Sequence, residues 1–159
     1  MKKNIIDQLG ALAIGARMRR LTDMFAKDVM QIYEENDLDF EPKYFALFYL
    51  VAERKSVGIV EAAQELSFTH PAVIHFAKDL EKRGYIQSVK DANDNRKRLL
   101  QLTNKGEKAL PKFQVLWDKI NKLNQKLMNK QTHHLLKAIE EMEIQLETQP
   151  YYKRFKEMK

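Results

Sequence analysis

The chain has 159 residues, of which 44% are hydrophobic and 31% are charged, and its formal net charge is +6 at pH 7. This length suits a single domain, or a domain with dimerisation arms. The absence of cysteine excludes disulfides and thiolate metal sites, and no apolar run approaches the roughly 18 residues of a membrane span. We therefore expect a cytoplasmic protein with no membrane partner.

The positive charge is unevenly distributed along the chain. Residues 69–112 carry 10 basic and 5 acidic side chains, whereas residues 1–68 carry 9 basic and 11 acidic ones. Clustered positive charge favours binding to a polyanion, because such binding is driven by local counterion release. A solvated basic surface without any partner is the alternative interpretation of the charge alone.

Residues 4–36 are predicted to form one long helix or two helices in sequence, because their apolar residues recur at helical spacing. The start of the chain resembles a signal peptide, but Asp7, Gln8 and Arg17 interrupt its apolar residues. A helix of this length exceeds the usual globular size, which favours packing against a partner chain. Residues 43–54 are predicted to form a nearly all-apolar helix in the core, with four aromatic residues packed inside: Tyr44, Phe45, Phe48 and Tyr49.

Two shorter helices are predicted next, over residues 59–66 and 70–83. Thr69 is a suitable N-cap for the second, Pro71 lies in its first turn, and Gly84 is suited to ending it. Helical spacing predicts an inward face of Val73, Phe76, Ala77 and Leu80. It predicts an outward face of His70, Ala72, Ile74, His75, Lys78 and Asp79.

A hairpin is predicted after this helix, with strands over residues 85–90 and 98–102 joined by turn-forming residues. Thr103 is predicted to cap a further helix over residues 104–130, followed by another over 132–147. Pro150 interrupts the helical pattern, and the aromatic and basic tail after it is expected either to dock on a partner or to fray.

Several of these segments occur together in one known family. They are EAAQEL at 61–66, THPAVIHFAKDLEKRGYI at 69–86, the D-x-x-D-x-R series of Asp91, Asp94 and Arg96, and LTNKG at 102–106. In this order and spacing, the chain resembles the MarR family of bacterial winged helix-turn-helix transcription regulators.

The resemblance implies a mainly α fold with a small β-hairpin wing. It implies an N-terminal dimerisation arm over residues 1–42, a DNA-binding lobe over 43–108, and C-terminal dimerisation helices with a tail over 109–159. The expected function is that of a homodimeric, sequence-selective regulator, a repressor, on a pseudo-palindromic site in double-stranded DNA. No enzymatic activity and no cofactor are expected.

Physical reasoning assigns candidate DNA contacts to this fold. The helix over 70–83 would lie in the major groove, with His75 on a purine edge, Ala72 and Ile74 on thymine methyl groups, and Thr69 on a phosphate. Arg96 would enter the minor groove with Asp94 orienting its guanidinium, and nearby cations would contact phosphates. The full predicted set is Thr69, His70, Ala72, Ile74, His75, Lys78, Lys90, Asp94, Arg96, Lys97 and Arg98.

The chain departs from the family pattern in its reading helix. That helix has no arginine, and its exposed first turns have no Asn or Gln. Its capacity for bidentate base contacts is therefore low, so specificity is modest or depends on DNA shape. Asn95 stands where many relatives have Arg, which removes one charge from the wing.

The resemblance also implies a small aromatic ligand, such as an aromatic acid, between the dimer arm and the DNA-binding lobe. The candidate residues for this site are Ile14, Met18, Phe45, Phe48 and Tyr49.

The titratable residues also have other interpretations. The pairs His70 with His75 and His133 with His134 lack the spacing of a zinc site. Asp91 and Asp94 lie in a basic loop where nothing raises a carboxyl pKa, which disfavours catalysis. His75 as an exposed residue without function and Asp94–Arg96 as a turn-stabilising pair remain alternatives. A winged-helix protein-interaction module without specific DNA binding is the alternative function.

Overall fold

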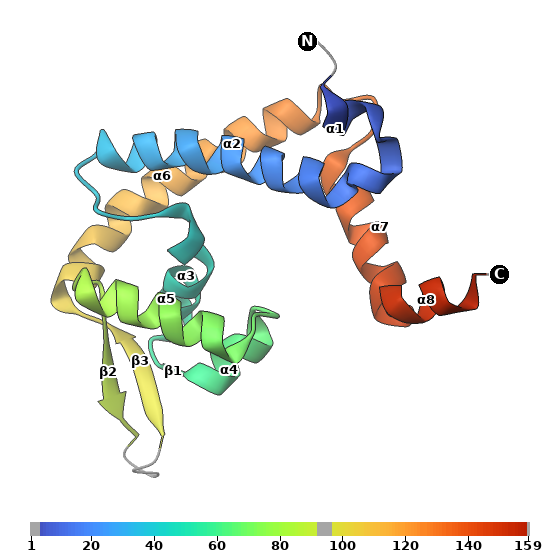
Figure 1. Ribbon diagram of the computed structural model, residues 1–159. Helices are drawn as coiled ribbons and strands as arrows, with labels where there is room; N and C mark the ends of the chain where they lie inside the picture. Colours follow the sequence, from blue (N-terminus) through green and yellow to red (C-terminus); the bar gives the residue numbers. More distant parts are fainter. Residues whose placement is uncertain (1–3, 92–96, 159) are drawn as a thin grey trace. The chain divides into compact units, whose positions relative to one another are not determined.

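The computed structural model describes residues 4–91 and 97–158 (Figure 1). The chain divides into two compact units with a boundary between Leu110 and Pro111. Helices dominate the described residues, and three short strands form one antiparallel sheet. The predicted mainly α fold with a β-hairpin wing is confirmed. None of the described helices combines the length and the apolar character needed to cross a membrane.

The N-terminal segment forms separate helices in sequence: α1 (Ile5–Gln8), the short 3-10 helix η1 (Gly10–Ala13) and α2 (Ile14–Glu34). Arg20 of α2 binds Asp7 of α1 across 2.6 Å, which ties the two helices together. The chain leaves α2 through Asp37, whose φ of 52° is in the left-handed region, close to the predicted break.

An aromatic cluster forms the centre of the first unit. Phe40 lies in the linker after α2, and its ring meets four other rings edge to face at centroid distances of 5.2 to 5.8 Å. These rings belong to Tyr33, Tyr44, Phe48 and Tyr85. The linker therefore contributes to the core. Its burial could not be predicted from the sequence, because the linker has no helical periodicity.

The next elements are the 3-10 helix η2 (Pro42–Tyr44) and α3 (Phe45–Arg54). Burial in the core is confirmed for Tyr44 and Phe48, which are 1% and 0% exposed, but it is wrong for Phe45 and Tyr49, which are 40% and 46% exposed. A nearly all-apolar helix carries no polar stripe to mark its outer face, so the sequence could not distinguish the two pairs.

The helices α4 (Ile59–Glu65) and α5 (His70–Lys82) end within one residue of their predicted bounds. The predicted inward face of α5 is buried at Val73, Ala77 and Leu80. Phe76 is only partly buried, and its ring packs near Tyr44 and Phe68, at centroid distances of 6.1 and 6.0 Å. α5 is thus anchored along one side and open along the other.

The sheet has the order β1-β3-β2, with β1 (Val57–Gly58), β2 (Ile86–Lys90) and β3 (Arg98–Leu102). β2 and β3 form the predicted hairpin, in a register that pairs Ile86 with Leu102 and Lys90 with Arg98. β1 was not predicted, because two residues are too few to show strand alternation.

The corner after the hairpin depends on two glycines. Gly84 has a φ of 76°, which L side chains rarely adopt, and it ends α5 as predicted. A Cβ at Gly106 would lie 2.1 Å from the backbone oxygen of Tyr85, so only glycine fits this close approach. Thr103 joins both sides of the corner, because its hydroxyl donates to the Gly84 oxygen and accepts from the Gly106 N–H.

The helix α6 (Asn104–Met128) begins at this corner, with Pro111 inside it, and crosses the boundary between the units. The second unit continues with α7 (Leu135–Thr148) and α8 (Tyr151–Glu157). The tail after Pro150 is therefore helical. Arg154 holds α8 to the end of α7 by donating to the backbone oxygens of Gln145 and Gln149.

Candidate nucleic-acid interface

The N-terminal end of α5 is open to solvent. The hydroxyl of Thr69 accepts a hydrogen bond from the backbone N–H of Ala72 across 3.4 Å, which confirms the predicted cap. Pro71, in the first turn, has no N–H to satisfy. The positive end of the helix dipole and the N–H groups of its first turn favour a bound anion here.

The outward face of α5 agrees in most positions with the predicted one. His70, His75 and Lys78 are exposed, while Ala72 and Ile74 are partly buried. These five side chains offer two imidazoles, one cation and two small apolar contacts over about two helical turns. This surface can contact base edges and phosphates but cannot make a bidentate contact to guanine, because it lacks Arg.

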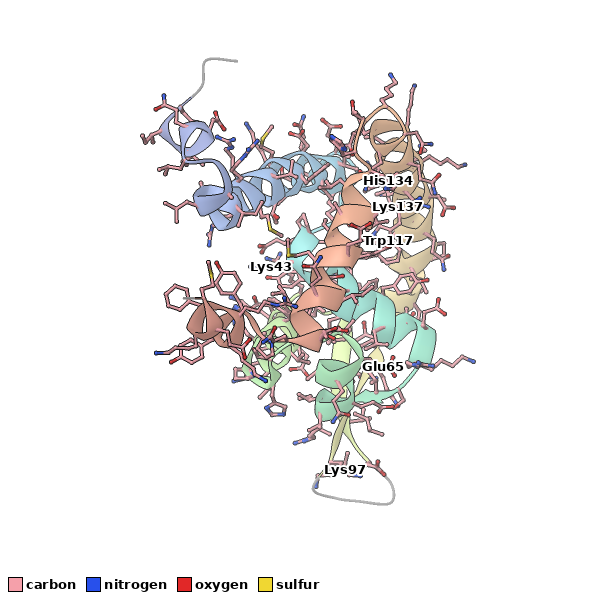
Figure 2. All side chains as sticks on the ribbon, turned by 90° about the vertical axis from the view of Figure 1, so that its right-hand side faces the viewer. Lys43, Glu65, Lys97, Trp117, His134 and Lys137 are labelled. Atoms are coloured by element: carbon pink, nitrogen blue, oxygen red, sulfur yellow. The ribbon has the colours of Figure 1, made fainter. Side chains whose placement is uncertain are left out.

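The hairpin provides exposed cations next to this helix. Lys90, Lys97 and Arg98 are all exposed at the outer end of the two strands, and Figure 2 shows Lys97 where the chain enters β3. The N–H of Asp91 donates to the backbone oxygen of Lys97 across 3.1 Å, which extends the ladder by one bond. The predicted contacts Asp94 and Arg96 lie outside the described residues.

A groove of about 590 Å³ brings part of the predicted set together. It lies between the first turns of α4, the start of α5 and the outer end of the hairpin strands. Three of the predicted residues line it, namely His70, Lys97 and Arg98, together with the carboxylates of Glu61 and Asp91. Glu61 is an additional residue of this surface that no sequence motif indicates. Cations from the hairpin and the exposed end of α5 therefore share one concave surface.

Asp79 was predicted to point outward, but its carboxylate is tied to the core. The buried hydroxyl of Tyr44 donates to Asp79 Oδ2 across 2.8 Å. This hydrogen bond is the main cause that lowers the pKa of the Asp79 carboxyl, against the opposing effect of burial. Positive charge on Lys43 and Arg83 and the nearby imidazole of His75 lower it further. Asp79 is therefore ionised at neutral pH.

Arg83, just after α5, continues this network toward the linker. Its guanidinium pairs with Asp39 and with Glu41, the latter across 2.5 Å, and lies over the Tyr44 ring at 5.4 Å. The pKa of Glu41 is lowered, chiefly by its hydrogen bond with Lys43. The partners are more than 40 residues apart in sequence. No local pattern could have revealed this link between α5 and the linker.

Two of the five predicted ligand residues line one groove of the described residues. Phe45 and Tyr49 line an apolar groove of about 460 Å³ with Leu50, Leu66 and the ion-paired Arg54. Three other predicted residues are not part of its lining: Ile14 and Met18 are exposed on α2, and Phe48 is buried in the aromatic cluster.

No group of three or more His, Asp or Glu side chains suited to a metal ion occurs within residues 4–91 and 97–158. His70 and His75 are both exposed. His134 instead caps α7, where its Nδ1 accepts from the backbone N–H of Lys137 across 3.4 Å (Figure 2).

Comparison with known sequences gives one similar curated protein, while no protein-family model matches the chain. The chain is 27% identical over 110 residues to the HTH-type transcriptional regulator Hpr of Bacillus licheniformis. The match covers 68% of this chain and 53% of that protein, so this chain spans about half of the length of its relative.

Comparison with solved structures gives similar folds over most of the chain. A mutant MarR from E. coli complexed with operator DNA has a TM-score of 0.64 at 17% identity, covering 91% of this chain and 99% of that one. NMB1585, a MarR family regulator from Neisseria meningitidis, has a TM-score of 0.57 at 25% identity, covering 92% and 96%. Together with the helix order, the hairpin and the corner at Thr103, these similarities show that the chain has the winged helix-turn-helix fold of MarR-type regulators.

Proposed function

We propose that the chain is a sequence-selective regulator of transcription that binds double-stranded DNA as a homodimer in the cytoplasm. The observation that carries this proposal is the shared concave surface of His70, Lys97 and Arg98, formed by the start of α5 and the hairpin. A groove that carries Lys97 and Arg98 beside an open helix N-terminus suits a phosphate backbone next to a major groove.

Each predicted contact has a role in this proposal. α5 lies in the major groove, where His75 and Lys78 face base edges and phosphates, and Ala72 and Ile74 meet apolar base surfaces. Thr69 and the N–H groups of the first turn receive a phosphate. Lys90, Lys97 and Arg98 neutralise neighbouring phosphates, while Arg96 and Asp94 are assigned to the minor groove from the sequence alone.

Homodimerisation is supported by apolar side chains that lack cover on the first unit. Large patches of this kind are typical of protein interfaces. On α1, η1 and α2 the exposed large apolar residues are Ile5, Leu9, Leu12, Ile14, Met18, Leu21, Met24, Phe25 and Met30. We assign residues 1–42 and 109–159 to dimerisation and residues 43–108 to DNA binding. Two lobes related by a twofold axis would then read a pseudo-palindrome with half-sites one helical turn apart, about 34 Å.

A small aromatic acid is proposed as the effector that releases DNA in a repressor. The groove of Phe45, Tyr49 and Leu50 has a volume of about 460 Å³, in the range typical of ligand sites. Arg54 at its edge could pair with a carboxylate, although Glu65 holds it across 3.0 Å. A ligand that binds one spacing of the two lobes better than another would shift the population away from the DNA-binding state.

The proposed function is tested by footprinting the full chain on the genomic region that flanks its own coding sequence. A protected site that is lost on sequence scrambling, with affinity that falls steeply between about 50 and 200 mM salt, is the expected result. Equal affinity for scrambled DNA, or no binding at low salt, would instead favour the winged-helix protein-interaction module. Thermal shift and DNA affinity measured with aromatic acids test the effector separately.

A further inference from the structure

The carboxylate of Asp79 lies between a buried hydroxyl and an exposed imidazole. Its Oδ2 accepts the hydrogen bond from Tyr44 across 2.8 Å, and the same oxygen lies 3.6 Å from Nε2 of His75, one helical turn earlier on α5. The His75 side chain is 66% exposed, whereas that of Asp79 is 30% exposed. Asp79 thus connects the core to the outward face of α5.

The position of this carboxylate is fixed from the core side. The Tyr44 ring is buried, packs edge to face against Phe40 and Phe76, and lies under the guanidinium of Arg83. The acceptor oxygen is therefore held in place by packed aromatic rings in addition to the helix backbone.

A fixed carboxylate influences which ring nitrogen of His75 carries the proton. The separation of 3.6 Å is longer than a hydrogen bond, so the effect is electrostatic attraction to the nearer N–H. A neutral imidazole has one protonated nitrogen, which donates, and one unprotonated nitrogen, which accepts. A partner that attracts the N–H of one nitrogen therefore leaves the other nitrogen as the acceptor. With the proton on Nε2, Nδ1 is left as a hydrogen-bond acceptor.

We propose that Asp79, anchored by Tyr44, is a positioning residue that orients neutral His75 as a hydrogen-bond acceptor for a base. An acceptor in the major groove selects the exocyclic amino groups of adenine N6 or cytosine N4 and disfavours guanine O6 and N7, which are themselves acceptors. This inference rests on the proposed function and specifies what one residue of the interface recognises.

The test measures base preference at every position of the footprinted site at pH 8. The full-length chain is compared with His75→Ala and Asp79→Asn. Both variants are expected to lose about fivefold in preference for adenine or cytosine at the same base pair, and the double variant no more than either. Replacing that base by an analogue without the amino group should cost wild type the same factor and cost His75→Ala nothing.

Two further variants separate positioning from a general effect on folding. Tyr44→Phe removes the anchoring hydroxyl and should reduce the same preference, while Glu81→Gln removes a different carboxylate from α5 and should leave it unchanged. Thermal melting confirms that each variant is folded.

Two results would overturn the inference but not the proposed function. One is that Asp79→Asn weakens binding equally at all base positions, and the other is that the base contacted by His75 is a preferred guanine. A wild-type chain that binds no duplex would overturn the inference together with the proposed function.

Discussion

Residues 38–103 and the N-terminal helices α1, η1 and α2 differ in how much of their apolar surface is buried. Within residues 38–103, α3, α5 and the sheet bury side chains such as Phe48, Leu80 and Leu100 in a core. Along α1, η1 and α2, Ala13 and Tyr33 are the buried apolar residues, and Leu12 is 84% exposed. The first region therefore buries most of its large apolar side chains, while the N-terminal helices leave many of theirs exposed, as we expect for the proposed dimer contact.

The largest expected effect is a difference in the free energy of unfolding between substitutions on the two faces of α3. Phe48→Ala should lower the free energy of unfolding by about 3–5 kcal/mol, because it leaves a cavity in the aromatic cluster. Tyr49→Ala, on the exposed side of α3, should cost less than about 1 kcal/mol. Urea denaturation at one protein concentration measures both, and equal losses would contradict the assignment of the two faces.

Substitutions on the N-terminal helices α1, η1 and α2 are expected to weaken dimerisation more than folding. A double variant Leu12→Glu with Met24→Glu places charges on the exposed apolar side chains and should weaken the dimer at least tenfold, about 1.4 kcal/mol. Thr22→Glu adds a charge to an exposed polar position of α2 as the control. Sedimentation equilibrium reports the dissociation constant, and a wild-type chain that stays monomeric at high concentration would contradict the dimer proposal.

The hydrogen bond from Tyr44 to Asp79 predicts that the stability of the fold depends on pH. The pKa of Asp79 is lowered in the folded state, so its contribution to stability is present above the unfolded pKa and is lost as pH falls through the folded one. Tyr44→Phe removes the main cause, so the loss of stability between about pH 5 and pH 3 should be shallower than in wild type. Denaturation at a series of pH values measures this slope.

Tyr151→Phe removes an exposed hydroxyl from α8 and is the matched control, with an expected slope equal to that of wild type. A Tyr44→Phe slope as steep as that of wild type would show that the hydroxyl does not stabilise the ionised carboxylate.

The smallest expected effect concerns the cap of α5. Thr69→Ala should destabilise the lobe by about 1 kcal/mol, and Thr69→Ser, which retains the hydroxyl, should recover most of that loss. The midpoint of thermal unfolding distinguishes the two variants. If Ser and Ala behave alike, the hydroxyl of Thr69 does not act as the cap.

The sequence predicted well wherever local chemistry determines the backbone. Thr69 and Gly84 mark the ends of α5, and Thr103 with Gly106 marks the start of α6, so these bounds agree closely with the structure. Prediction failed where burial depends on distant partners, as for the exposed Tyr49 and for Asp79, whose partner is 35 residues away. The wing residues Asp94 and Arg96 stay predictions.

We propose above all that the hairpin cations and the start of α5 contact the phosphate backbone of the same DNA duplex. The most direct measurement is the salt dependence of the affinity of the full chain for its footprinted duplex, by fluorescence anisotropy. Lys97→Ala and Arg98→Ala should each reduce the slope of log affinity against log salt by about 1, while Lys122→Ala on α6 leaves it unchanged. Slopes for Lys97→Ala and Arg98→Ala equal to that of wild type would contradict the account.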